Sequence, residues 1–355
     1  MRVGILSYPM LFQRDGGLQI QVRETIAALN RLPPGPPRGL RVELLDPTRE
    51  RVDDYDLIHV FSAINGNYRI VELAKERGLP VVLSALLSPA WDHRSGIVAR
   101  LAERLTGKLT TWNVQTNYAQ SKRALQLADR VIALGEPERQ AIISGFQIEP
   151  GKIQVYPNGV NPQFFGADET LFRRVTGIVG PFVLVVGAIS PYKNQLGLAR
   201  ALLDTELPLV LIGAPQRSDP VYLQDLLRMP HVNWLGALDH ADPLLASAYG
   251  AATVVALPSQ GEVFPLSVLE ALAAGTPVLM TVDSALELPG ADFALKKVRW
   301  DDPCGQRLAV RALLEAPPER GAVRALVSHL TWERVAAQIA SCYLSLFPAE
   351  QPRPG

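Results

Sequence analysis

Apolar residues in the first half of the chain gather in short runs, and amphipathic segments with helical spacing lie between them. Such alternation is typical of buried parallel strands connected by helices. It predicts an α/β fold in which a parallel sheet carries helices on both faces. The predicted strands are 3–6, 42–45, 57–61, 81–83 and 128–134, and the predicted helices lie near 18–29 and 70–77.

The same pattern restarts in the second half. Its predicted strands are 182–186, 209–212, 232–235, 253–257 and 278–281, and a helix begins near Gln195. A chain of 355 residues exceeds the size at which one hydrophobic core keeps growing, so two Rossmann-like halves are expected. We predict a linker near 161–179, a last helix over 331–346 and a disordered tail over 348–355.

One carboxylate interrupts the most apolar helical segment. Residues 258–277, PSQGEVFPLSVLEALAAGTP, place Glu270 inside a helix that we expect to open at Pro265, as its first residue, and to close at Gly275. A buried carboxylate without a partner is costly. We therefore expect Glu270 to face a polar cavity in which a ligand binds.

Glu262 lies in the loop just before this helix. The first N–H groups of a helix have no partner within it and carry partial positive charge, so they suit a phosphate. Two carboxylates beside a phosphate would repel it unless they bind hydroxyl groups. A nucleotide-sugar meets these demands: its diphosphate binds the helix N-terminus, and its sugar and ribose hydroxyls bind the two glutamates.

Charge and cysteine usage narrow the function further. The chain has 35 acidic and 35 basic residues, which argues against a nucleic-acid partner. Cys304 and Cys342 have neither metal-ligand nor disulfide spacing, and no apolar stretch reaches the length of a membrane span, so a soluble cytoplasmic protein is expected. The basic residues of 94–130 favour a solvated face, with peripheral contact to a membrane or an anionic acceptor as the alternative.

Four motifs, in this order, resemble those of the retaining GT-B glycosyltransferases of the glycogen-synthase-like and mannosyltransferase-like superfamily, the glycosyltransferase family 4 type. They are the glycine loop 15–18 (DGGL), the segment 155–161 (VYPNGVN), the phosphate-lysine loop 186–194 and the glutamate pair of 262–270. The resemblance covers nearly the whole chain and implies two Rossmann-like, doubly wound parallel-sheet domains that face each other across a cleft.

We expect an acceptor-side domain over 1–165 and a nucleotide-sugar domain over 166–330. The segment 331–355 is expected to cross back to the N-terminal domain as a helix followed by the disordered tail. The resemblance implies hexosyl transfer, with retention, from a nucleotide-diphosphate sugar to the hydroxyl of a glycan, a lipid-linked or a small-molecule acceptor. Polysaccharide or glycoconjugate biosynthesis is the implied context.

The resemblance also assigns roles to residues. Lys193 and Glu262 are the implied catalytic residues, because the ammonium neutralises the leaving diphosphate and the carboxylate holds the donor sugar. Glu270 is implied to bind the ribose. No cofactor and no metal are expected, since the one Asp-x-Asp motif, 54–56, lies in the other half. The donor-binding set is completed by Gly16, Gly17, Ala237, Leu238, Phe264, Leu266 and Ser267.

Some positions depart from the family pattern. Ala188 and Tyr192 stand where many relatives have arginine, and Ser84 and Ala85 stand where relatives often have histidine. These departures leave open a catalytically weak scaffold that binds a nucleotide-sugar or a protein partner without transfer. Epimerisation of a nucleotide-sugar is a further alternative.

Three further residues of the first half are of interest, and two of them, His93 and Asn158, are candidates on the acceptor side. His93 is the candidate replacement for the missing histidine, and Asn158 belongs to the Pro-Asn-Gly segment. His59 matches a position where relatives tend to have histidine. As a strand residue, it is alternatively a packed, hydrogen-bonded group of the core.

Overall fold

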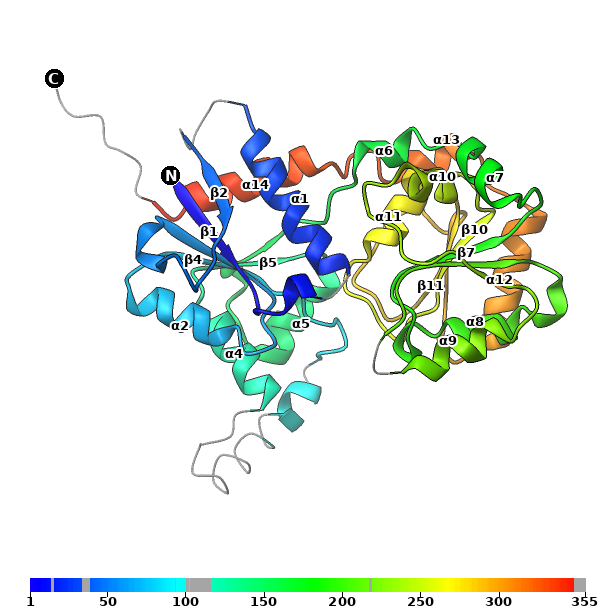
Figure 1. The fold of residues 1–355 in the computed structure, drawn as a ribbon. Coiled ribbons are helices and arrows are strands. Elements are labelled where there is room, and N and C mark those ends of the chain that lie inside the picture. The colour runs from blue at the N-terminus through cyan, green and yellow to red at the C-terminus, as the bar shows by residue number, and fades with distance from the viewer. Residues whose placement is uncertain are drawn as a thin grey trace. The chain divides into compact units, whose positions relative to one another are not determined.

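The computed structural model describes residues 1–13, 16–33, 39–92, 94–99, 102, 116–216 and 219–347. The chain divides into two compact units (Figure 1). Unit 1 comprises Met1–Arg14, Gln21–Asn158 and Trp332–Gly355, and unit 2 comprises Asp15–Ile20 and Gly159–Thr331. The tail over 348–355, predicted to be disordered, lies outside the described residues. No helix of the described part is both long and apolar enough to cross a membrane.

Within the described residues, unit 1 contains a sheet of six parallel strands in the order β2-β1-β3-β4-β5-β6. Its central strands are buried throughout, because helices cover both faces. The predicted strands are confirmed, with boundaries that shift by at most two residues, and β6 was not predicted. The strands are β1 (Arg2–Leu6), β2 (Arg41–Leu44), β3 (Leu57–Phe61), β4 (Val81–Ser84), β5 (Arg130–Ala133) and β6 (Ile153–Val155).

Two layers of helices cover this sheet. Figure 1 shows α1 (Gly17–Arg31) and α14 (Trp332–Leu344) on one face. The other face carries α2 (Tyr68–Glu76), α4 (Asn117–Leu127) and α5 (Glu136–Phe146). The final helix predicted over 331–346 is therefore α14, and it packs against the sheet of unit 1.

Unit 2 contains a second parallel sheet, for which the described residues give six strands in the order β12-β11-β10-β7-β8-β9. The chain runs outward from β7 to β9, returns to the other side of β7 and runs outward again. The order thus reverses between β7 and β10. The strands are β7 (Val183–Val186), β8 (Leu209–Ile212), β9 (Val232–Trp234), β10 (Val254–Leu257), β11 (Val278–Thr281) and β12 (Leu295–Val298).

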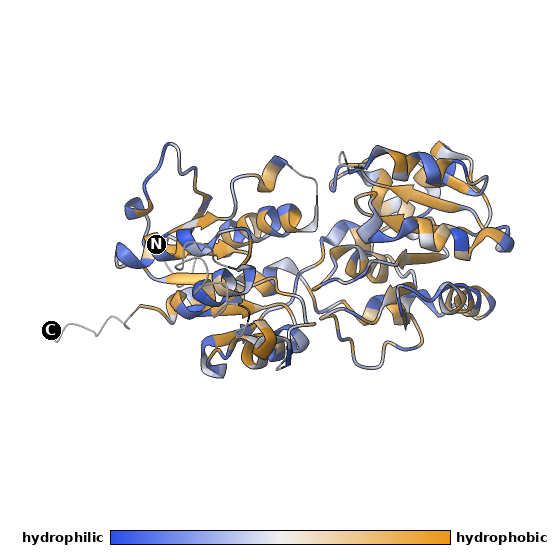
Figure 2. Ribbon diagram, turned by 90° about the horizontal axis from the view of Figure 1, so that it is seen from below, coloured by the Kyte–Doolittle hydropathy of each residue, from blue (hydrophilic) through white to orange (hydrophobic). Residues whose placement is uncertain are grey.

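Helices also cover both faces of the second sheet. In Figure 2 its strands are largely orange, whereas the helices carry both colours, as expected of elements that bury one side. One face carries α8 (Gln195–Ala201), α9 (Pro220–Leu227) and α12 (Pro303–Glu315), and the other carries α10 (Pro243–Ala251), α11 (Leu266–Ala273) and α13 (Arg320–Ala325).

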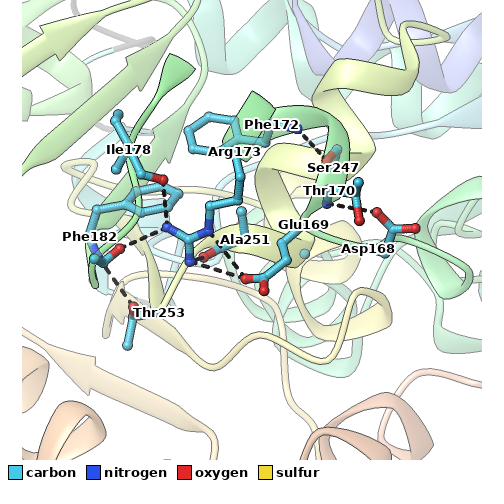
Figure 3. Close-up of polar contacts among 12 residues, drawn as sticks. Asp168, Glu169, Thr170, Phe172, Arg173, Ile178, Phe182, Ser247, Ala251 and Thr253 are labelled. Carbon is cyan, nitrogen blue, oxygen red and sulfur yellow. Dashed lines mark hydrogen bonds and ion pairs between the residues drawn. The ribbon is translucent and has the colours of Figure 1, made fainter. Parts of the chain in front are cut away.

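The prediction of a linker near 161–179 is wrong, because this segment contains two helices and packs into unit 2. It forms α6 (Pro162–Phe165) and α7 (Thr170–Thr176), and the side chains of Phe164 and Phe172 are fully buried. Both helices are too short to show an apolar period, so the pattern reads as a break. Figure 3 shows Arg173, whose guanidinium donates to the carbonyl oxygens of Ile178 and Ala251 at 2.9 and 3.2 Å. It also donates to the carbonyl oxygen of Gly180 at 2.8 Å, and together these bonds hold the segment in place.

His59 is a packed group of the core of unit 1. Its Nδ1 lies 2.7 Å from the hydroxyl of Tyr343 in α14, and its Nε2 lies 2.9 Å from the hydroxyl of Ser84 in β4. The side chain has no exposed surface, and burial lowers its pKa to about 3. His59 is therefore a neutral group that joins the last helix to the sheet.

A carboxylate is also completely buried in unit 1. Glu138 lies in the first turn of α5, and its two oxygens accept the backbone N–H groups of Leu87 and Leu134, each at 2.7 Å. These bonds tie the loops after β4 and β5 to α5. Burial raises the pKa of Glu138 to about 7, although the backbone donors lower it.

Candidate functional site

The loops that follow β7 and β10 meet at the carboxyl edge of the second sheet. The two strands are direct neighbours, and the strand order reverses between them. Tyr192, in the loop after β7, forms two hydrogen bonds with the loop after β10. Its carbonyl oxygen accepts the N–H of Gln260 at 3.0 Å, and its hydroxyl donates to the carbonyl oxygen of Gly261. This edge is where open parallel sheets bind ligands.

Lys193 and Glu262 are brought together by these two loops. The ammonium of Lys193 forms an ion pair with the carboxylate of Glu262, and the two side chains are 24% and 17% exposed. The backbone N–H of Glu262 donates to the carbonyl oxygen of Asp283 at 2.9 Å, so the loop after β11 also holds Glu262. The two predicted catalytic residues thus lie side by side and bind each other.

Glycine is required directly after β8, next to the start of the lysine loop. Gly213, directly after β8, has a φ of +153°, and a Cβ there would lie 2.0 Å from the carbonyl oxygen of Gly187, directly after β7. The two strand ends therefore approach more closely than any side chain allows. The short turn after Gly187 is capped by Ser190, whose hydroxyl oxygen accepts the N–H of Lys193 at 3.4 Å.

The helix after Glu262 has nearly the predicted limits. It ends at Ala273, and Gly275 has a φ of +79°. Pro265, predicted as the first helical residue, instead precedes the helix, because its ψ of 122° is extended. Proline suits both the predicted and the observed position, because neither requires a backbone N–H group. The first helical residues are Leu266 and Ser267, whose N–H groups have no acceptor within the helix.

Glu270 is 5% exposed and bonded through both carboxylate oxygens. Oε1 lies 2.8 Å from Nε2 of His240, and Oε2 accepts the hydroxyl of Tyr249 at 2.8 Å. The polar partners of this carboxylate are therefore side chains of the protein, and the polar cavity in which a ligand binds stays a prediction. Sequence reasoning missed His240 and Tyr249, since neither stands at a spacing that points to Glu270.

The remaining predicted donor residues are spread over unit 2. Phe264 is 8% exposed and lies between Glu262 and the helix. Ala237 and Leu238 follow β9, in the loop that leads to His240. Gly16 and Gly17 are exposed at the start of α1, where an added Cβ would meet no atom within 4 Å.

The predicted acceptor-side features are only partly described. Asn158 is 3% exposed at the end of a segment of unit 1. His93 lies outside the described residues, as do residues 100, 101 and 103–115 of the basic stretch 94–130. In the part of the chain that the structure describes, no three His, Cys, Asp or Glu side chains are placed to hold a metal ion.

Comparison with known protein families identifies two matching regions. The family model Glycosyltransferase Family 4 matches residues 6–164, and Glycosyl transferases group 1 matches residues 169–287. D-inositol 3-phosphate glycosyltransferase 1 from Catenulispora acidiphila is 25% identical over 328 residues, which cover 85% of this chain and 75% of that protein. The D-inositol 3-phosphate glycosyltransferase of Streptosporangium roseum is 27% identical over 312 residues, which cover 81% and 69%.

Solved structures show the same fold. Sucrose-phosphate synthase from Thermosynechococcus elongatus has a TM-score of 0.75 at 20% identity, over 98% of both chains. Anabaena HepE, in complex with UDP and glucose, has a TM-score of 0.69 at 17% identity, over 97% of this chain and 99% of that one. The two parallel sheets with flanking helices are those of the GT-B fold.

Proposed function

Because this chain belongs to the family 4 type of glycosyltransferases and has the GT-B fold, we propose that it transfers a hexosyl group from a nucleotide-diphosphate sugar to an acceptor hydroxyl. In this proposal the anomeric configuration is retained, and neither a metal ion nor another cofactor takes part. The observation that supports it is the ion pair of Lys193 and Glu262. Glu262 lies four residues before Leu266, the first residue of α11.

The ion pair and the helix N-terminus offer complementary groups to such a donor. The N–H groups of Leu266 and Ser267 would bind the diphosphate, helped by the partial positive charge of the helix. Lys193 would turn from Glu262 to the diphosphate, which competes for the same ammonium. Glu262 would then accept a hydroxyl of the donor sugar. Donor binding would thus exchange one ion pair for another.

Sugar transfer breaks the bond between the anomeric carbon and the diphosphate oxygen, and the electron pair leaves with the oxygen. Lys193 and the N-terminus of α11 would stabilise this negative charge, which is larger in the transition state than in the bound donor. The departing oxygen would take the proton of the acceptor hydroxyl while that hydroxyl bonds to the same face of the anomeric carbon. No side-chain nucleophile is needed.

Glu270 would bind the ribose of the donor. Its two oxygens each hold one hydrogen bond from the protein, and a carboxylate oxygen can accept a second. Gly16, Gly17, Ala237, Leu238 and Phe264 would complete the donor site. His93 and Asn158 remain proposed acceptor-side residues.

The acceptor of the similar proteins suggests the acceptor to try first. Those relatives are D-inositol 3-phosphate glycosyltransferases, so a phosphorylated polyol is our first choice. We place the protein in the cytoplasm and within glycoconjugate or polysaccharide biosynthesis. Peripheral contact with a membrane through 94–130 belongs to the same proposal.

Binding without transfer is the second candidate function. Two observations favour it: Lys193 is engaged by Glu262, and the hydroxyl of the neighbouring Tyr192 is engaged by Gly261. A protein that kept this arrangement with a donor bound would lack the cation that transfer needs.

A screen of UDP-, GDP- and ADP-sugars separates these functions. Thermal shift identifies the donor, and release of the nucleoside diphosphate with D-inositol 3-phosphate or other polyols measures transfer. We expect Glu270→Ala to raise the KM for the donor about tenfold, since it removes a charged hydrogen-bond partner. The matched control is Glu315→Ala, which removes only the surface pair with Arg311.

Full turnover by both Glu270→Ala and Glu262→Gln would contradict the assignment of the donor site. A thermal shift without nucleotide release for any acceptor would favour the binding scaffold. Product formed without an acceptor would favour epimerisation.

A further inference from the structure

His240 is held within unit 2 through both its backbone and its ring. The amide of Gln163 donates to the carbonyl oxygen of His240 at 2.7 Å, and the ring of Phe164 lies 5.4 Å from the imidazole, centroid to centroid. Nε2 of the ring lies 2.8 Å from Oε1 of Glu270. The ring therefore has a fixed place between α6 and α11.

The direction of the hydrogen bond between His240 and Glu270 follows from chemistry. An ionised carboxylate only accepts, so Nε2 of His240 must carry the hydrogen. The other oxygen of Glu270 accepts from Tyr249, which is fully buried. Burial and the charge of Glu270 raise the pKa of Tyr249 well above its usual value, so the phenol keeps its proton. Two donors from different elements thus fix the plane of the carboxylate.

This arrangement connects two parts of the proposed donor site. His240 lies two residues after Leu238, in the loop whose residues Ala237 and Leu238 are proposed to bind the donor, and Glu270 is proposed to bind the ribose. The side chains of His240 and Glu270 are 16% and 6% exposed, so water competes little for the hydrogen bond between them.

We propose that His240 is a positioning residue for the ribose: its Nε2–H orients the Glu270 carboxylate so that the outward lone pairs receive the ribose hydroxyls. The proposal rests on the proposed function, because it assumes a nucleotide donor. His240 sharpens the discrimination between ribose and deoxyribose without itself contacting the sugar that is transferred. Without His240, Glu270 keeps one donor and its carboxylate turns more freely.

Calorimetric binding to the full chain tests this role. The probes are UDP, GDP and ADP with their 2′-deoxy and 3′-deoxy forms, and the ribonucleotide that wild type binds most tightly is used for the variants. We expect His240→Ala to weaken binding of that ribonucleotide about tenfold and binding of its deoxy forms less than about threefold, as loss of one charged hydrogen bond would do.

Three further variants separate positioning from folding. In His240→Gln the amide nitrogen reaches about as far as Nε2, so discrimination is kept, whereas the shorter His240→Asn loses it. The matched control is His231→Gln: His231 is also partly buried in unit 2, and its Nε2 contacts the carbonyl oxygen of Ala199 at 3.0 Å. The control is expected to bind all nucleotides as wild type does. Thermal denaturation checks that each variant folds. If His240→Ala does not fold, the comparison of His240→Gln with His240→Asn tests the positioning role.

Two results would overturn the proposal. The first is equal weakening of ribonucleotide and deoxynucleotide binding by His240→Ala and His240→Asn. The second is unchanged discrimination in these variants while Glu270→Ala abolishes it, which would leave the proposed function standing and remove the role of His240. If wild type binds none of these nucleotides, or if Glu270→Ala keeps the discrimination, the proposed function fails as well.

Discussion

Replacing Lys193 by alanine is expected to lower kcat for sugar transfer by about 10³-fold. The ammonium would be the one side-chain cation beside the leaving diphosphate among the described residues of the two joined loops, since Ala188 and Tyr192 carry no charge. Removal of a preorganised charge that acts on the transition state typically lowers kcat by about 10² to 10³. Glu262 would also lose its partner, so that its negative charge near the diphosphate would no longer be balanced.

The measurement is release of the nucleoside diphosphate at saturating donor and acceptor. Lys296→Ala is the control, because the ammonium of Lys296 contacts only the carbonyl oxygen of Asp292 in an exposed bond. The double variant Lys193→Ala with Glu262→Gln should lose less than the product of the single losses, since the two side chains act as a pair. A Lys193→Ala protein with more than a tenth of wild-type turnover would refute the role of Lys193.

The stability of unit 1 is expected to depend on pH through two buried groups that act in opposite directions. Burial lowers the pKa of His59 from its ordinary value of 6.5 to about 3 in the folded chain. Below pH 6.5 the unfolded chain therefore binds a proton that the folded chain does not, and stability falls with falling pH. The loss is complete only below pH 3, where it totals about 5 kcal/mol.

Glu138 gives the opposite slope. Burial raises its pKa from the ordinary value of 4.5 to about 7 in the folded chain. Between these values the folded chain keeps a proton that the unfolded chain has lost, so stability falls as pH rises, by about 3 kcal/mol in total. From pH 4.5 to pH 6.5 the contributions of His59 and Glu138 largely offset each other.

Replacing one of the two residues should therefore reveal the pH dependence of the free energy of unfolding that the other contributes. Relative to wild type, the free energy of unfolding of Glu138→Gln should rise with pH by about 1.4 kcal/mol per unit between pH 4.5 and 6.5. That of His59→Gln should fall with pH by a similar amount. Urea denaturation followed by tryptophan fluorescence at several pH values gives both differences, because the other titrating groups are common to all three proteins. Equal slopes in the two variants would show that burial does not shift these groups.

The sequence predicts the strands well wherever both faces are buried. The strands Leu57–Phe61, Leu209–Ile212 and Val278–Thr281 have the predicted limits, since full burial requires an unbroken apolar run. The strand β12 was missed because Lys296 and Lys297 break its pattern at the edge of the sheet. Among these strands of similar length, the fully buried ones could be predicted from the sequence and the partly exposed one could not.

Residue chemistry alone predicted the candidate site only where its residues are close in sequence, and Lys193 was added by the resemblance to a known family. Glu262, Leu266 and Glu270 form one local motif, and helix chemistry alone suggests how they could bind a donor. The ion pair of Glu262 with Lys193 and the bonds of Glu270 with His240 and Tyr249 join segments that are distant along the chain. Such partners are set by strand order and helix packing, which no local spacing encodes.

A crystal structure of the protein with the nucleoside diphosphate chosen by the donor screen tests the central claim most directly. The account predicts the diphosphate at the N–H groups of Leu266 and Ser267, with Lys193 turned from Glu262 toward it and the ribose hydroxyls on Glu270. A nucleotide bound elsewhere, or a diphosphate that leaves Lys193 paired with Glu262, would contradict it.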